Sequence, residues 1–194
     1  MEKNSNYNLP SAEQLQTELK RERNRIRYRR LLKNTIYTLI IVAAIAVLIA
    51  TLVLPVLQIS GTSMLPTLDN GEIVVLIKTD RLDYGDLCAF SYSNKILIKR
   101  VIGLPGDVLF LDDDGTVYIN GYALEEPYLT EKAFGECDIE FPYTVPEGAY
   151  FLMGDQRATS IDSRNTVIGC ITSEQLIGKL FLRVWPLPKA GLLN

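Results

Sequence analysis

Residues 59–68 of this chain read Ile59-Ser60-Gly61-Thr62-Ser63-Met64-Leu65-Pro66-Thr67-Leu68. The stretch begins where the only long apolar run of the sequence ends, and the pattern of a β-rich domain follows it. Its glycine, threonine and proline residues predict a loop with Ser63 at its centre. A serine in a loop is more often a turn residue than a nucleophile, so Ser63 gains a functional interpretation only from the rest of the chain.

The apolar run before this loop extends from Ile36 to Leu57, and its 22 residues carry no charge. About 20 such residues cross the hydrocarbon core of a bilayer as a helix. A cleavable secretory signal is the alternative, but its apolar core usually has about 7–15 residues and is followed by small residues. This run is longer and ends in Leu54-Pro55-Val56-Leu57-Gln58. We therefore expect residues 35–58 to be an uncleaved transmembrane signal anchor in the lipid bilayer.

Charge is distributed unevenly on the two sides of this run. Residues 1–34 hold nine Lys and Arg against four Glu, a net charge of +5, whereas the remainder has −8. Basic residues can bind nucleic acid, but directly before an apolar span they are typical of its cytoplasmic flank. We expect a cytoplasmic segment at 1–34, mobile up to Pro10 and helical from a capping box at Ser11, with residues 59–194 extracytoplasmic. No nucleic-acid partner is expected.

After residue 60, short apolar runs alternate with turn signals. Asn120-Gly121 lies between two such runs and is a strong hairpin signal. Only Ser173–Ile177 has the pattern of a short helix. We therefore predict an all-β, antiparallel domain at 59–194, preceded by one transmembrane α-helix. The predicted strands are Glu72–Ile77, Leu87–Tyr92, Ile96–Ile102, Val108–Leu111, Val117–Ile119, Tyr150–Met153 and Lys179–Val184.

The chain contains no histidine, which excludes the Ser-His-Asp triad, the Cys-His pair and histidine-dependent zinc sites. A hydrolase built on this chain must use Lys, Asp, Glu or Tyr as its general base. Cys88, Cys137 and Cys170 are widely spaced and show no CxxC pattern, so we interpret them as small buried side chains. A disulfide involving Cys137 remains open. No residue pattern indicates a metal or an organic cofactor.

Lys99 is the candidate general base. It lies in the predicted strand 96–102 beside Arg100, and adjacent strand residues point to opposite faces. One of these two cations must therefore lie near an apolar face, where burial lowers a lysine pKa from its ordinary value of about 10.4. Arginine cannot be deprotonated usefully, which leaves Lys99. The alternative is a lysine whose amine reaches water at the sheet surface.

A polar loop follows the predicted strand 150–153 and reads Gly154-Asp155-Gln156-Arg157-Ala158-Thr159-Ser160-Ile161-Asp162-Ser163-Arg164. It is either a solvated loop held by Asp–Arg pairs or a support that holds a catalytic lysine in place.

Together the three stretches resemble the type I signal peptidases, membrane-bound serine proteases that release signal peptides from exported proteins. The resemblance rests on residues 60–68, 99–107 and 154–164, and it continues through Gly169, Gly178-Lys179 and Trp185-Pro186. It covers residues 20–186. The single preceding anchor and the short span between the second and third motifs are similar to the compact Gram-positive form.

The resemblance implies antiparallel sheets in a partly open barrel, as in signal peptidases and self-cleaving repressors. Ser63 would be the acylated nucleophile, and Lys99, as a neutral amine, would take its proton. Ser160 would orient the Lys99 amine. The resemblance also implies two ion pairs, Asp162–Arg164 and Arg100–Asp155. Five residues would line shallow substrate pockets for small side chains, as in the Ala-x-Ala cleavage pattern: Ile59, Met64, Leu68, Leu97 and Ile98.

Two positions depart from the family pattern. The Ser63 N–H would contribute to the oxyanion hole, but some relatives add the hydroxyl of a serine two residues earlier, where this chain has Gly61. Ser60 is adjacent but need not replace that serine. Gln156 stands where the family usually has asparagine. The second oxyanion donor therefore stays open.

The implied partners are signal-peptide-bearing preproteins and the lipid bilayer, with proximity to the secretion translocon as a further expectation. Two alternatives stay open. A specialised relative would process pilin or another restricted substrate with identical motifs, and an inactive membrane-anchored β-domain would serve binding or assembly.

Overall fold

The computed structural model describes residues 12–79 and 81–193, without the side chains of residue 14 and residues 49–53. The segment up to Pro10 that we expect to be mobile, and Ser11 of the capping box, lie outside the described residues. The chain divides into two compact units, Met1–Leu52 and Val53–Asn194.

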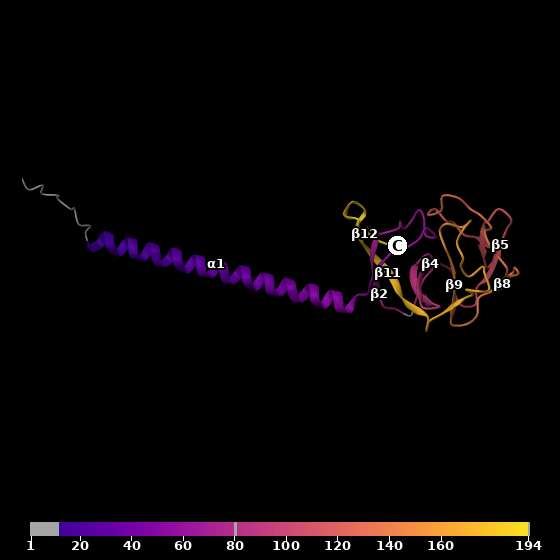
Figure 1. Ribbon diagram of the computed structural model, residues 1–194, viewed down its shortest axis with the longest axis horizontal. Helices are drawn as coiled ribbons and strands as arrows, with labels where there is room; N and C mark the ends of the chain where they lie inside the picture. Colours follow the sequence, from indigo (N-terminus) through magenta and orange to yellow (C-terminus); the bar gives the residue numbers. More distant parts are fainter. Residues whose placement is uncertain (1–11, 80, 194) are drawn as a thin grey trace, which may run out of the picture. The chain divides into compact units, whose positions relative to one another are not determined.

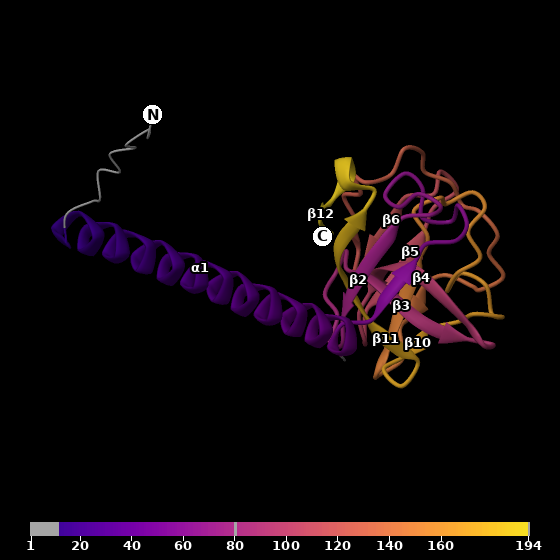
Figure 2. The same ribbon diagram turned by 60° about the vertical axis from the view of Figure 1, so that its left-hand side comes forward.

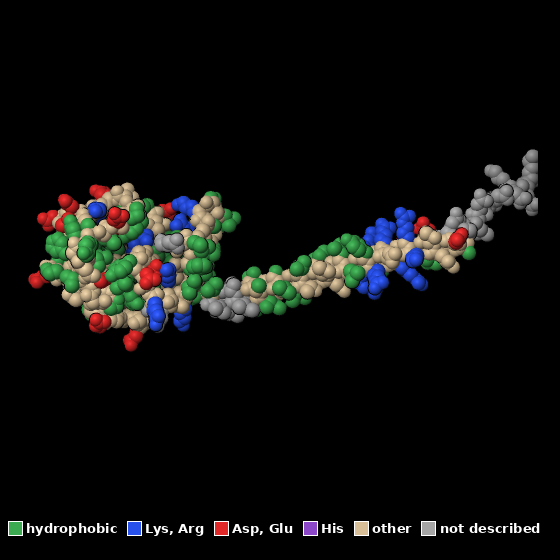
Figure 3. Space-filling model, turned by 180° about the vertical axis from the view of Figure 1, so that it is seen from behind, with side chains coloured by type: hydrophobic (Ala, Val, Ile, Leu, Met, Phe, Trp, Pro, Cys, Tyr) green, Lys and Arg blue, Asp and Glu red, His purple; other side chains and the backbone are tan. Residues whose placement is uncertain are grey.

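The first unit is formed by helix α1 (Ala12–Val53), which has 42 residues. Figure 3 shows Lys and Arg side chains gathered on its N-terminal part and hydrophobic side chains on the part that follows. Among the described residues it is the one helix long and apolar enough to cross a membrane. The predicted span 35–58 is helical only as far as Val53. Pro55 explains this end, because a proline lacks an N–H and disfavours helical geometry in the residue before it.

The second unit contains two antiparallel sheets (Figures 1 and 2). Its elements are β1 (Val56–Gln58), β2 (Ile73–Ile77), β3 (Leu87–Tyr92), β4 (Lys95–Gly103), β5 (Val108–Leu111), β6 (Val117–Ile119), β7 (Tyr122–Ala123), β8 (Tyr143–Thr144), β9 (Ala149–Met153), β10 (Ile171–Thr172), β11 (Leu176–Trp185), η1 (Leu187–Lys189) and β12 (Gly191–Leu192).

The larger sheet has the strand order β1-β2-β11-β3-β4-β9-β10, with β12 paired to β11. The smaller sheet has the order β7-β6-β5-β8. In Figure 1, β2, β11 and β12 lie at one side of this unit, and β5 and β8 lie at the other. Within residues 53–79 and 81–193 neither sheet closes into a barrel. The prediction of one apolar helix followed by an antiparallel β-domain is confirmed.

Two local predictions had different outcomes. The hairpin at Asn120-Gly121 is confirmed, because both residues have positive φ, 52° and 87°, and β6 pairs with β7 across them. The predicted helix at Ser173–Ile177 is wrong. Its first residues form a turn in which the Gln175 N–H donates to the Thr172 carbonyl at 3.0 Å, and Leu176 starts β11. Five residues are too few for a stable helix, and pairing of Leu176 with Phe90 of β3 draws the segment into the sheet.

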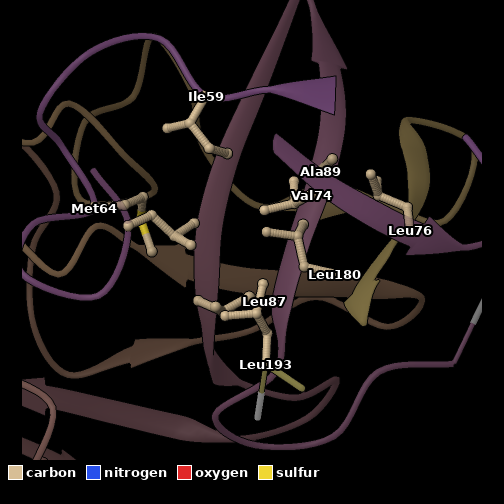
Figure 4. Packing of buried hydrophobic residues seen from close by; sticks show 9 residues of the cluster. Ile59, Met64, Val74, Leu76, Leu87, Ala89, Leu180 and Leu193 are labelled. Carbon is tan, nitrogen blue, oxygen red and sulfur yellow. The ribbon is translucent and has the colours of Figure 1, made fainter. Parts of the chain in front are cut away.

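One core cluster joins the loop at 59–68 to the larger sheet (Figure 4). Ile59 and Met64 of the loop are 5% and 3% exposed. They pack with residues of β2, β3 and β11, which include Val74, Ala89 and Leu180. Burying such a side chain stabilises the fold by about 1.5–3 kcal/mol, so Ile59 and Met64 fix the loop on both sides of Ser63.

Candidate active site

Backbone hydrogen bonds fix the loop that carries Ser63. The Ile59 N–H donates to the Glu72 carbonyl at 2.8 Å, and the Gly71 N–H donates to the Ile59 carbonyl at 2.9 Å. After Ser63 the chain makes a helical turn in which the Leu68 N–H donates to the Met64 carbonyl at 2.9 Å. The half-buried Ser63 is therefore held between two ordered segments.

Gly61 occupies a backbone position that favours glycine, with φ of +103°. An added Cβ would have no atom within 4 Å, so conformation rather than space selects glycine here. Its N–H is already used, because it donates to Asn70 Oδ1 at 3.1 Å. The Ser63 N–H, by contrast, donates to no acceptor within the described part of the chain, which leaves it available to a ligand.

Lys99 lies on β4 with a side chain only 3% exposed. Its Nζ donates to Ser160 Oγ at 2.9 Å. Burial is the main cause that lowers the pKa of Lys99 from 10.5 to about 8. The Asp162 carboxylate opposes this by raising the pKa, Arg164 lowers it, and the Asp155 carboxylate raises it. The amine is therefore neutral in a large fraction of molecules near pH 8.

Arg100, the next residue of β4, is also 3% exposed, so both of the adjacent cations Lys99 and Arg100 are buried rather than one. Its guanidinium donates to both carboxylate oxygens of Asp155, at 2.9 and 2.7 Å. A fixed charge inside the domain requires such a partner, because an unpaired buried ion is strongly destabilising. Arg100 stays protonated in this ion pair, so Lys99 is the one of the two residues that can lose a proton.

The loop at 154–164 joins the Lys99 side of the site to the Ser63 side. The Gln156 N–H donates to the Ser63 carbonyl at 3.0 Å, while Ser160 accepts from Lys99. The completely buried pair Arg164–Asp162, at 2.8 Å, fixes the end of the loop. This loop is a rigid, paired support rather than a solvated segment.

Ser63 and Lys99 line the same groove, which has a volume of about 350 Å³. Among the described residues no hydrogen bond joins Ser63 Oγ to Lys99 Nζ. Such bonds are often long in an unliganded enzyme and tighten with substrate. The remaining lining residues are mostly apolar and come from two segments: Leu57, Gln58, Ile59, Ser60, Gly61 and Met64, and Ile96, Leu97 and Ile98.

The family described as signal peptidase, peptidase S26, matches residues 32–185. This range includes both segments that line the groove and the supporting loop at 154–164. The chain belongs to this family.

Curated relatives of the family are similar over most of their length. Signal peptidase I of Bacillus licheniformis is 39% identical over 163 residues, which cover 75% of this chain and 87% of that protein. Signal peptidase I S of Bacillus subtilis (strain 168) is 36% identical over 152 residues, 72% of this chain and 82% of that protein. A crystal structure of a signal peptidase I from Enterococcus faecalis V583 shares 33% identity and covers 52% of this chain and 97% of that chain, with a TM-score of 0.45. This family member is therefore a serine peptidase.

Four of the five residues predicted to line substrate pockets in this peptidase do line the groove. Leu68 does not line the groove, because its side chain is 0% exposed and packs in the core beneath the loop. Sequence analysis missed Leu57, Gln58 and Ile96. Leu57 and Gln58 were assigned to the anchor, although they form β1 and pair with β2.

A third buried ion pair of the peptidase, Arg157–Glu126, was not predicted from the sequence. Both side chains are 0% exposed, and Arg157 Nε donates to the Gly154 carbonyl at 3.2 Å. No local signal marks this pair, since its members are 31 positions apart.

The three cysteines are free thiols, and burial raises the pKa of Cys88. Within residues 12–79 and 81–193 no group of three Cys, Asp or Glu side chains could hold a metal ion.

Gly154 gives a first prediction. An added Cβ would lie 2.1 Å from Ser160 Oγ and 2.6 Å from the Ser63 carbonyl oxygen, so Gly154→Ala must displace both. We expect a destabilisation of about 1–3 kcal/mol and a loss of kcat/KM of about 10²-fold. Peptidase assays and thermal unfolding check this. Gly191→Ala is the control, because its Cβ would meet nothing within 4 Å; equal losses in both variants would contradict the prediction.

Proposed function

We propose that this peptidase is a membrane-anchored endopeptidase that cleaves signal peptides from exported preproteins with a Ser63/Lys99 dyad. The observation that carries the proposal is the buried Lys99 amine, held by Ser160 at 2.9 Å in the groove that Ser63 lines. Family membership supports the substrate class. The absence of histidine from the sequence requires a different base, and this lysine meets that requirement.

In the first step the neutral Lys99 amine takes the proton of Ser63 Oγ, which attacks the carbonyl carbon of the scissile bond. The developing oxyanion accepts a hydrogen bond from the Ser63 N–H. Collapse of the intermediate breaks the C–N bond, and the Lys99 ammonium gives its proton to the leaving amine. An acyl-enzyme on Ser63 remains.

In the second step Lys99, again neutral, takes a proton from water, and the resulting hydroxide attacks the acyl carbonyl. The tetrahedral intermediate expels Ser63 Oγ, which regains its proton from Lys99. Ser160 keeps the amine in place by accepting its hydrogen bond in both steps. The cycle uses no group other than these side chains, the backbone and water.

The groove is lined mostly by apolar residues, and we expect it to accept small side chains on either side of one residue, the Ala-x-Ala type of site. Helix α1 would anchor the protein once in the membrane, with the basic segment cytoplasmic and the β-domain outside. A substrate held by its own apolar segment would meet the groove near the membrane surface, close to the translocon. Confinement of both partners would supply proximity without tight side-chain recognition.

The test is to incubate the purified full-length protein with a set of exported preproteins and to map each cleaved bond. We expect single cuts after small-x-small sequences, following the apolar core of the signal. Cuts in one restricted substrate, such as a pilin, would replace the general assignment with a specialised one. No cleavage and no labelling by a serine-directed acylating probe would favour an inactive binding domain.

The second prediction concerns pH. Because Lys99 must be neutral, kcat/KM should rise with pH and level off above an apparent pKa of about 8. Below this value the rate should fall by about tenfold per pH unit, since the fraction of neutral Lys99 amine falls by that factor. Initial cleavage rates from pH 6 to 10 check this, with tryptophan fluorescence to verify folding. A flat profile in folded protein would contradict the role of Lys99.

A further inference from the structure

Tyr128 lies in the turn that follows β7, at a place that sequence analysis did not connect with the site. The turn is closed by the Leu129 N–H, which donates to the Glu126 carbonyl at 3.1 Å. The centre of the Tyr128 ring is 3.8 Å from Arg100 Cζ. Its hydroxyl donates to Glu126 Oε1 at 2.8 Å. One half-buried side chain therefore contacts a buried cation with its ring and a buried carboxylate with its hydroxyl.

The Arg100 guanidinium makes hydrogen bonds at each of its three nitrogens. Nε and Nη2 donate to Asp155, Nη1 donates to the Gly85 carbonyl at 2.7 Å, and Nη2 also donates to Thr67 Oγ1 at 3.3 Å. These donors lie in the guanidinium plane, so they leave its faces uncovered. The Tyr128 ring covers one face, and such a contact is strongest where the cation is desolvated.

The Glu126 carboxylate, which accepts a hydrogen bond from the Tyr128 hydroxyl, also holds another buried arginine. Glu126 pairs with Arg157, which in turn donates to the Gly154 carbonyl. Gly154 begins the segment whose Ser160 accepts the hydrogen bond of Lys99. The turn at 126–129 therefore contacts two of the three arginines that hold segment 154–160 in place; the third, Arg164, donates to the Arg157 and Ser160 carbonyls.

We propose that Tyr128 is a positioning residue for the reaction of Ser63 with Lys99. The inference rests on the proposed function. The ring keeps Arg100 paired with Asp155, and this pair ties β4 to the segment that holds the Lys99 amine. Tyr128 itself acts through these neighbours, because neither of its contacts reaches the groove.

The arrangement also has an electrostatic consequence. The charged groups that act on Lys99 are Asp155, Asp162 and Arg164. Arg100 neutralises the first of these carboxylates from 2.7 Å. Without the ring, water can reach the guanidinium and the ion pair loosens, so the Asp155 charge acts more strongly on Lys99. The pKa of Lys99 then rises, and the pH dependence of the reaction moves to higher pH.

The test compares Tyr128→Leu with Tyr128→Phe in the full-length protein. The leucine variant should lose between about 10-fold and 100-fold in kcat, with KM little changed and the rising limb of the pH profile at higher pH. The phenylalanine variant keeps the ring and should retain the wild-type pH profile. Tyr118→Leu is the matched control, since that ring lies 5.9 Å from Phe110 in the smaller sheet. If the leucine variant does not fold, Tyr128→Met replaces it.

Each profile is measured twice, by preprotein cleavage and by labelling of Ser63 with a serine-directed acylating probe. Labelling needs the base but not the preprotein. If the wild type does not cleave preproteins, the result contradicts the proposed function but not the role of Tyr128. A ringless variant that is folded and labelled with the wild-type rate and pH dependence would overturn the role of Tyr128, as would an equal loss in Tyr128→Phe.

Discussion

Lys99→Met and Lys99→Arg should each lower kcat/KM for preprotein cleavage by at least about 10³-fold, as removal of a catalytic base does in other serine peptidases. Methionine has nearly the length of lysine but no basic nitrogen. Arginine keeps the charge, yet it cannot be deprotonated at any working pH. The loss should persist at pH 10, where the wild-type amine is neutral. Initial rates of cleavage, at saturating and at low substrate concentration, measure it.

The methionine variant should remain folded, and at neutral pH it should be more stable than the wild type. The pKa of Lys99 is about 8 in the folded state and 10.5 ordinarily, so the unfolded state binds more protons between these values. Stability of the wild type therefore rises with pH in this window, and below it the buried ammonium costs about 3 kcal/mol. Loss of the Ser160 hydrogen bond offsets about 1 kcal/mol. The net gain of about 2 kcal/mol should shrink above pH 8, and above pH 10.5 the variant should be less stable than the wild type by about 1 kcal/mol.

Lys95→Met is the matched control for this prediction. Lys95 begins the same strand, β4, but its side chain is exposed. It should retain wild-type activity, because an exposed lysine has no part in the groove. Cleavage by Lys99→Met within tenfold of the control would remove the dyad from the mechanism.

Sequence analysis predicted those features of the fold that depend on neighbouring residues. Short apolar runs between turn signals predicted β2–β6, β9 and β11, and Asn120-Gly121 predicted a hairpin, because each signal acts within a few positions. The predicted helix at Ser173–Ile177 is wrong because pairing with the distant strand β3 determined a structure that the local apolar pattern did not reveal. Pro55 ends α1 before residue 58, and the pairing of Val56–Gln58 with β2 could not be predicted from the apolar run.

In the candidate site, too, some residues could be predicted from the sequence and others could not. Ser63 and Lys99 could be proposed because residue chemistry limits what can replace histidine. The low pKa of Lys99, however, follows from its burial in the folded domain, which alternation along one strand suggested for only one of the two cations. Glu126 and Tyr128 could not be assigned at all. Their partners, Arg157 and Arg100, lie in other strands and loops, and only the fold brings them together.

Glu126→Gln should destabilise the domain by about 3–5 kcal/mol, which is the cost of leaving a buried ion without its partner. Glu126 and Arg157 are both 0% exposed, so water cannot replace the missing charge. The amide also weakens the acceptor of the Tyr128 hydroxyl. Urea unfolding of the full-length protein in detergent measures the effect. The chain has one tryptophan, Trp185 at the end of β11, which reports on the domain directly.

The double variant Glu126→Leu/Arg157→Met separates the cost of an unpaired charge from the value of the pair. When both charges of this pair are removed, neither residue is left as an unpaired buried ion, and the loss should be smaller than that of Glu126→Gln alone. Asp69→Asn is the control, because its partner Lys189 is exposed and surface pairs contribute little. A double variant less stable than Glu126→Gln would mean that the ion pair itself stabilises the domain. In the expected result, Glu126 is needed chiefly because the buried Arg157 must not be left unpaired. Arg157 is buried where it donates to the Gly154 carbonyl beside the site.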